Sequence, residues 1–230
     1  MNRATLLALT AAVAFSCPAF AQEDGPNVAA SGLAPSGTAV RAAHLAGELA
    51  ALGRQRGDAL LLVTAAGLAK SVAARTVERD GEVEPIEGLE TVADEAATEP
   101  DGWEAMLAEA EKLAPGDETI EGLAEDVRAA NTKGKTDGPA YNIATLPAGK
   151  RGVFRNVPFE GSRYAEVYVE GTGRSNLDLF IKDGKGHIVC SDTDPSDINY
   201  CGWTPKWTGP FTIIVENRGK AANKYKLMTN

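Results

Sequence analysis

The chain has 230 residues, of which 43% are hydrophobic and 24% charged, and its formal net charge is −9. This length suits one large globular domain or two small ones. The charge is uneven: residues 22–135 hold 22 acidic and 10 basic side chains, whereas residues 136–230 hold 10 acidic and 12 basic ones. An acidic half argues against a nucleic-acid partner, because such a surface needs clustered Lys and Arg.

The first 21 residues have the layout of a secretory signal peptide. Arg3 precedes an apolar run over residues 6–15, and Ala19-Phe20-Ala21 offers a cleavage site after Ala21. The run is too short for a transmembrane helix, which needs about 20 apolar residues, and no later segment approaches that length. We therefore expect a periplasmic or secreted protein without a transmembrane segment. The alternative is a lipoprotein signal with Cys17 as the acylated residue, although the usual leucine three positions earlier is missing.

Residues 22–35 are rich in Gly, Pro, Ala and Asn and are predicted to be a flexible leader. Helical periodicity follows over residues 36–131, which we interpret as an acidic helical domain. Four helices are expected, and they are predicted to form a small bundle of two αα-hairpins. The apolar face of the first helix is predicted to carry Val40, His44, Leu45, Leu49 and Leu52. The second helix starts after Asp58, and its apolar stripe includes Leu61, Leu62, Ala65, Leu68 and Val72. The third and fourth helices are predicted over residues 101–113 and 117–130.

A polar linker at residues 132–139 contains glycine and proline. After it, apolar residues recur at every second position, as they do in a β-strand, and no longer at helical spacing. Ala165, Val167 and Val169 alternate with larger or polar residues, and residues 177–182 repeat the pattern. Turn sequences recur between such segments up to the end of the chain. Residues 140–230 are therefore predicted to form an antiparallel β-sandwich, so that the whole protein is an α+β chain of two domains.

Two cysteines remain after removal of the signal peptide, Cys190 and Cys201. In an oxidising compartment such an isolated pair is predicted to form a disulfide. Neither a zinc site nor a redox motif fits, because no histidine lies close by and there is no C-x-x-C sequence.

The sandwich residues resemble the bacterial pre-peptidase C-terminal domain. The similarity lies in Asn176-Leu-Asp-Leu-Phe-Ile, in the hairpin Asp183-Gly-Lys-Gly-His-Ile-Val, and in two later strands, Gly209-Pro-Phe-Thr-Ile-Ile-Val and Lys224-Tyr-Lys-Leu-Met-Thr. It covers roughly residues 140–230. The resemblance implies a jelly-roll-like, non-catalytic module that serves export or adhesion to protein or polysaccharide, and some members bind calcium. This chain departs from the pattern in its cysteine pair, and no peptidase domain is recognised before the module.

No catalytic residue is predicted. Only His44 and His187 could serve as the general base of a serine hydrolase, and His44 falls on an apolar helix face while His187 follows a turn. The enzymatic alternative is a hydrolytic or peptidase-associated site in the helical half, for which Glu104, Glu109 and Glu111 are the candidate carboxylates.

Two groups of binding residues stand out near the disulfide. Asp192, Asp194 and Asp197 either bind calcium, which prefers several oxygen ligands, or form an ordinary Asp-Pro turn. No other cofactor is predicted. Tyr200, Trp203 and Trp207 either stack on a sugar or anchor a protein partner, or else Trp203 fills the core and only Trp207 is exposed in part.

These features favour an exported, non-catalytic binding or adaptor protein whose sandwich engages an extracytoplasmic protein or polysaccharide. A hydrolytic enzyme and a structural envelope protein without a specific ligand are the alternatives. The sequence identifies neither the partner nor the oligomeric state.

Overall fold

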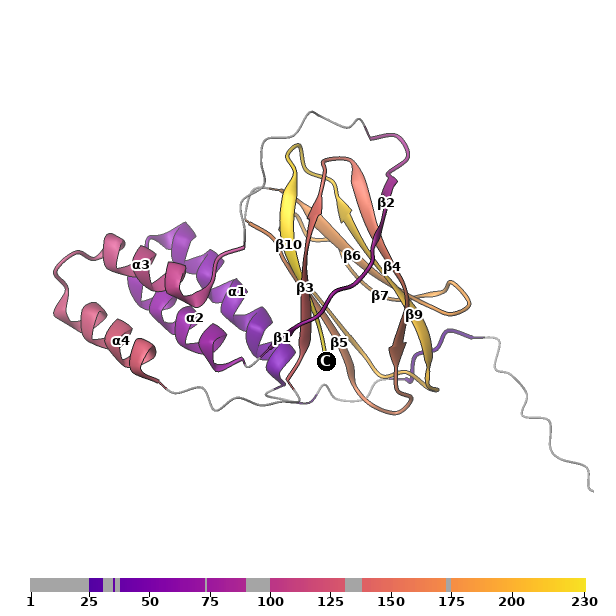
Figure 1. Cartoon of the computed structure of the whole chain (residues 1–230), viewed down its shortest axis with the longest axis horizontal. Helices are drawn as coiled ribbons and strands as arrows, with labels where there is room; N and C mark the ends of the chain where they lie inside the picture. Colours follow the sequence, from indigo (N-terminus) through magenta and orange to yellow (C-terminus); the bar gives the residue numbers. More distant parts are fainter. Residues whose placement is uncertain are drawn as a thin grey trace, which may run out of the picture.

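The computed structural model describes residues 25–30, 35, 38–72, 74–89, 100–130, 138–172 and 175–230. Four helices lie on one side of a β-sandwich built from two five-stranded sheets (Figure 1). The predicted signal peptide, Cys17 and residues 132–137 of the predicted linker lie outside the described residues. In the described part of the chain, no helix is both long and apolar enough to cross a membrane.

The helices begin where side chains can accept hydrogen bonds from their first backbone N–H groups. The Asp58 carboxylate accepts from Leu60 N and Leu61 N, and Asp117 caps the fourth helix in the same way, through Thr119 N and Ile120 N. One apolar cluster joins all four helices. They are α1 (Ala39–Arg56), α2 (Ala59–Ser71), α3 (Trp103–Leu113) and α4 (Glu118–Ala129).

The buried face of α1 agrees only in part with the one predicted, which included the buried Val40 and His44. Leu45 is 45% exposed, whereas the small residues Ala43, Gly47 and Ala50 are buried together with Val40. The periodicity of leucines was misleading because α1 contacts both α2 and the sandwich. Such close packing on two sides favours small side chains over large ones.

The sandwich consists of sheet A, with strand order β1-β3-β10-β5-β8, and sheet B, with strand order β2-β4-β9-β6-β7. Apolar side chains from both inner faces form one core, with Phe154, Val167, Leu179 and Ile213 among them. All strand pairs are antiparallel except β1 with β3. The later strands are β3 (Ala140–Leu146), β4 (Lys150–Phe159), β5 (Ala165–Glu170), β6 (Leu177–Asp183), β7 (Ile188–Asp192), β8 (Ile198–Trp203), β9 (Gly209–Asn217) and β10 (Asn223–Thr229).

The sandwich takes its first two strands from residues 75–88, a stretch between the predicted helices that was assigned to the helical domain. β1 (Arg75–Thr76) adds to the edge of sheet A and β2 (Glu82–Pro85) to the edge of sheet B. These short strands have no apolar alternation, so sequence periodicity could not reveal them. Their pairing with β3 and β4 means that residues 36–131 are not one continuous helical unit.

Residues 25–30, expected to be part of a flexible leader, lie against the sandwich instead. Asn27 is 2% exposed, and its backbone N–H donates to the Asp183 carboxylate at 2.9 Å. Its side chain both accepts from Trp207 N and donates to Trp207 O. These three polar contacts explain why a segment of loop-forming composition is held in place.

β5 is buried on both faces, although its alternation predicted one solvent face. Val167 points into the sandwich core, while Tyr168 on the opposite face is also fully buried, because α1 covers it. Gly47 of α1 lies so close that a Cβ there would overlap the Tyr168 hydroxyl. Glycine is therefore required at this crossing of helix and sheet.

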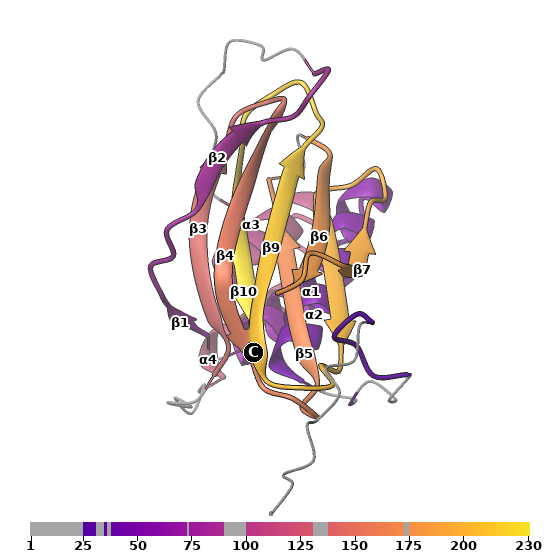
Figure 2. The same cartoon turned by 90° about the vertical axis from the view of Figure 1, so that its right-hand side faces the viewer.

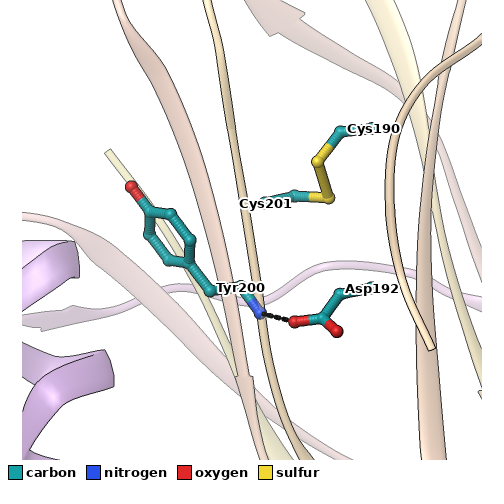
Figure 3. The surroundings of a disulfide bond; sticks show 4 residues. All are labelled: Cys190, Asp192, Tyr200 and Cys201. Carbon is teal, nitrogen blue, oxygen red and sulfur yellow. Dashed lines mark hydrogen bonds between the residues drawn. A yellow bond between two sulfur atoms is a disulfide. The ribbon is translucent and has the colours of Figure 1, made fainter. Parts of the chain in front are cut away.

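The predicted disulfide is confirmed. Cys190 of β7 and Cys201 of β8 are bonded, with their Cα atoms 5.9 Å apart. β7 and β8 are edge strands of different sheets, so the bond closes one side of the sandwich. Figure 3 shows that the neighbouring Tyr200 projects away from the disulfide, toward the helices.

Replacing Gly47 with alanine is expected to destabilise the fold by about 2 kcal/mol, because the new methyl group overpacks the contact with Tyr168. Chemical denaturation measures the change. Tyr168→Phe removes the overlapping oxygen and should recover part of the loss in the double variant. Gly122→Ala is the matched control: it lies in α4 with open space around it, so it should stabilise by up to about 1 kcal/mol. Equal effects at both glycines would contradict the close approach of α1.

The double substitution Cys190→Ala/Cys201→Ala is expected to lower the free energy of unfolding by about 2–4 kcal/mol, because the bond restricts the unfolded chain. Thermal melts with and without a thiol reductant provide the measurement. Reductant should lower the melting temperature of the wild type and leave that of the double variant unchanged. A wild-type melt insensitive to reductant would disprove the contribution.

Candidate binding site

The two sheets differ in how their outer faces are used. Helix α1 packs on β5 and β8, so the outer face of sheet A is largely occupied. Figure 2 looks onto sheet B and shows no helix in front of β4, β9 and β6. Sheet B therefore presents the open face of the sandwich.

A groove of about 440 Å³ runs over this open face, between β4, β9 and the β6–β7 hairpin. Val153 and Ile214 line its apolar floor, and both are almost fully buried. Asn156 lies at the groove edge with φ of 58° in a β-bulge of β4. Asn tolerates this left-handed conformation better than most residues, which explains its place at the bend.

Basic side chains border the groove on two sides. On the β4 side, Arg151 and Arg155 contact Glu84 of β2 at 2.8 and 2.9 Å. Arg151 also lies 3.9 Å from Glu216, and Arg155 pairs with Glu82 at 3.2 Å. Exposed ion pairs of this kind contribute little stability. Lys182 and Lys185 border the other side. The four cations and two acidic lining residues, Glu84 and Asp183, make the groove basic within an acidic chain.

Asp183 anchors this end of the groove. Its carboxylate accepts four hydrogen bonds, from Asn27 N, Lys185 N, His187 N and the His187 ring. Burial alone would raise the pKa of Asp183, but these donors stabilise the anion and bring its pKa below the usual value. The hairpin that carries Lys185 is thereby fixed to the segment around Asn27.

The three aromatic candidates have different surroundings. Trp203 is 4% exposed and packs against Phe159 and Phe211 in the core. Tyr200 lies under α1, and its hydroxyl donates to Glu166 at 2.7 Å. Trp207 is 36% exposed, with the Lys185 ammonium 5.8 Å from its ring centroid. Of the three, Trp207 therefore lies at the rim of the groove.

The three aspartates considered as calcium ligands accept hydrogen bonds from different donors. Asp192 accepts from Tyr200 N, Asp194 accepts from Ser196 N, and Asp197 accepts from the Asn223 side chain. Over the residues that the structure describes, no group of three or more His, Cys, Asp or Glu side chains is placed to hold a metal ion. The hydrogen bonds of Asp194 with Ser196 are those of an Asx turn. Calcium binding at this loop stays a prediction.

The carboxylates considered for hydrolysis are dispersed. Glu109 pairs with Arg54 at 2.9 Å and Glu111 with Arg128 at 2.7 Å, while Glu104 lies exposed in the first turn of α3. The exposed pairing with Arg128 lowers the pKa of Glu111. A general acid would need a raised pKa. The three carboxylates therefore do not resemble a pair of groups tuned for acid–base catalysis.

His44 is 8% exposed at the junction between α1 and sheet A. It stacks on Tyr200 with ring centroids 4.9 Å apart and meets the edge of Tyr168. Arg41 lies 3.2 Å from His44 Nδ1, so this nitrogen accepts and the ring is neutral. Burial lowers the pKa of His44, the Glu48 carboxylate opposes the shift, and Arg41 reinforces it. As expected from the sequence, the apolar face of α1 holds His44 as a packing residue.

The sequence did not single out Lys182 and Lys185, which line the groove. Lys182 and Phe180 alternate with the buried Leu179 and Ile181 on β6, which was a signal for their outward position. The sequence could not show that the other sheet is covered by helices. Because helices cover sheet A, the outer face of sheet B is the one that stays open.

No protein family matches the sequence, and no curated protein matches it either. Three proteins illustrate the distant likenesses that solved structures give. The first is the pre-peptidase C-terminal domain of a collagenase from Bacillus anthracis, with 8% identity over 42% of this chain and 80% of that one and a TM-score of 0.26. The second is PliG from Aeromonas hydrophila, a periplasmic inhibitor of g-type lysozyme, with 14% identity over 38% of this chain and 84% of that one and a TM-score of 0.23. The third is the Yersinia pseudotuberculosis-derived mitogen, with 15% identity over 39% of this chain and 85% of that one and a TM-score of 0.24. At these TM-scores the likenesses establish neither a family nor a function.

Because the pKa of His44 is lowered in the folded protein, the free energy of unfolding is expected to fall as the pH drops below about 6.5 and approaches that lowered pKa. In that range the unfolded chain binds a proton that the buried ring resists, so protons favour unfolding. Chemical denaturation from about pH 7.5 to about pH 5 measures this dependence. His44→Phe, which keeps the ring contacts without the titration, should show a flatter profile. A variant profile as steep as that of the wild type would exclude His44 as the source.

Proposed function

We propose that the chain is an exported, non-catalytic binding or adaptor protein that engages a protein or polysaccharide partner through the outer face of sheet B. The observation that carries this proposal is the asymmetry of the sandwich. Helices occupy sheet A, whereas sheet B offers an open basic groove of about 440 Å³ with Trp207 at its rim. Concave surfaces with an apolar floor and a few charged groups are favourable for ligand binding.

The disulfide supports the proposed location. Disulfides persist in oxidising compartments such as the periplasm and the cell exterior. Together with the signal-peptide pattern of residues 1–21, the Cys190–Cys201 bond supports export across the inner membrane. The resemblance of residues 140–230 to the jelly-roll-like pre-peptidase C-terminal domain supports the non-catalytic role.

The partner's contact with the groove is tested by charge reversal. Lys182→Glu/Lys185→Glu changes two of the lining cations while leaving the apolar floor intact. A photo-crosslinking residue at Thr212, which also lines the groove, should capture an envelope protein or glycan from the cell that produces this chain. Binding of the captured partner to the double variant should be at least about tenfold weaker, since 1.4 kcal/mol corresponds to tenfold.

Lys112→Glu/Lys220→Glu is the matched control, because it reverses two exposed cations outside the groove. It should bind as the wild type does. Equal affinity in the groove variant and the control, or no capture from position 212, would refute the assignment of this face. Melting temperatures of all variants show whether a loss of binding reflects unfolding.

A further inference from the structure

A second cavity lies on the opposite side of the sandwich, where α1, α2 and the start of α3 meet sheet A. Its volume is about 220 Å³. Its walls are mainly apolar: Ala43 and Ala46 come from α1, Ala69 from α2, Met106 from α3 and Met228 from β10. It is separate from the sheet B groove and uses none of its residues.

Three charged residues line this cavity, and two of them form an ion pair with each other. Glu170 of β5 and Lys226 of β10 are register neighbours, and their carboxylate and ammonium groups lie 3.2 Å apart. Their side chains are only 14% and 23% exposed. Burial raises the pKa of Glu170, and Lys226 opposes that shift. An apolar pair of similar volume would hold this junction at least as well, so stability alone does not account for the charges.

The third charged lining residue, Asp101, is already paired with Arg54 at 2.7 Å. Trp103 begins α3 and borders the cavity, and the Lys70 ammonium lies 4.3 Å from its ring centroid. Tyr141 of β3 contributes a second aromatic wall. Pockets at the junction of two structural layers that combine apolar walls with a few converging charges are the usual form of a small-molecule site.

We propose that this cavity binds a small zwitterion of the α-amino-acid type, with its ammonium group at Glu170, its carboxylate at Lys226 and its apolar side chain against Ala46, Ala69 and Met106. Such a ligand separates the ion pair and gives each protein charge a new partner, so no charge is left unpaired. A ligand with only one charge leaves the other protein group to be satisfied by water. The requirement for both charges is therefore the signature of this site.

The volume agrees with this class of ligand. A water molecule occupies about 30 Å³ in the liquid, so the cavity has room for roughly seven waters. A free amino acid with a branched apolar side chain has a similar number of heavy atoms. Larger peptides and oligosaccharides exceed this space.

Isothermal titration calorimetry on the full chain tests the proposal with L-valine, L-leucine and L-phenylalanine as probes. At least one of them is expected to bind saturably. For the best probe, the two matched analogues that lack one charge, the amino alcohol and the deaminated acid, should bind at least about tenfold more weakly, because each leaves a buried charge unpaired. Absence of saturable binding for all three probes, or equal binding of the analogues, would overturn the proposal.

Two kinds of variant locate the binding. Glu170→Gln removes the negative charge that would pair with the ammonium group, and Ala69→Leu fills the cavity while keeping both charges. Each should reduce the affinity at least about tenfold, whereas Lys182→Glu/Lys185→Glu in the sheet B groove should leave it unchanged. Binding that persists in both cavity variants would place the ligand elsewhere. Because this experiment uses neither the partner nor the groove, its failure leaves the function proposed for sheet B intact.

Discussion

The packing of α1 against the outer face of β5 determines how the rest of the molecule is used. Gly47 allows the helix to approach until it touches Tyr168, and Val40, Ala43 and Met228 close the contact. An ordinary antiparallel sandwich leaves two faces in water. Here one face becomes an interior surface, which leaves the outer face of sheet B uncovered by helices and creates a cavity beside α1.

The sequence predicted those parts of the fold that repeat a local pattern. Asp58 and Asp117 marked two helix starts, the period-two segments marked β5 and β6, and the paired cysteines gave the disulfide. It could not predict contacts made by segments without a pattern. β2 is a run of mostly exposed residues, and only its pairing with β4 makes it a strand. The fully buried Glu166 was likewise indistinguishable from the solvent-facing half of an alternation until α1 was in place.

The candidate sites follow the same division. The interior position of Trp203 and the partial exposure of Trp207 were among the outcomes foreseen from composition and spacing. The groove depends instead on which sheet is left uncovered, and the cavity depends on where three helices meet one sheet. Both are products of tertiary arrangement, which places Lys182 in the groove and Glu170 in the cavity, positions that their sequence neighbours do not indicate.

Residues 74–89 run from the edge of sheet A to the edge of sheet B. This path matters when the sandwich is produced as a separate fragment. A fragment that starts at the predicted domain boundary would lose β1 and β2, and with them the strands that cover β3 and β4. Ala140 and Tyr141 of β3 and residues 150–153 of β4 would then lose their backbone partners, and unpaired strand edges are a common cause of self-association. The sandwich therefore needs residues 75–76 and 82–85, which lie between the helices in the chain, to complete the edges of its two sheets.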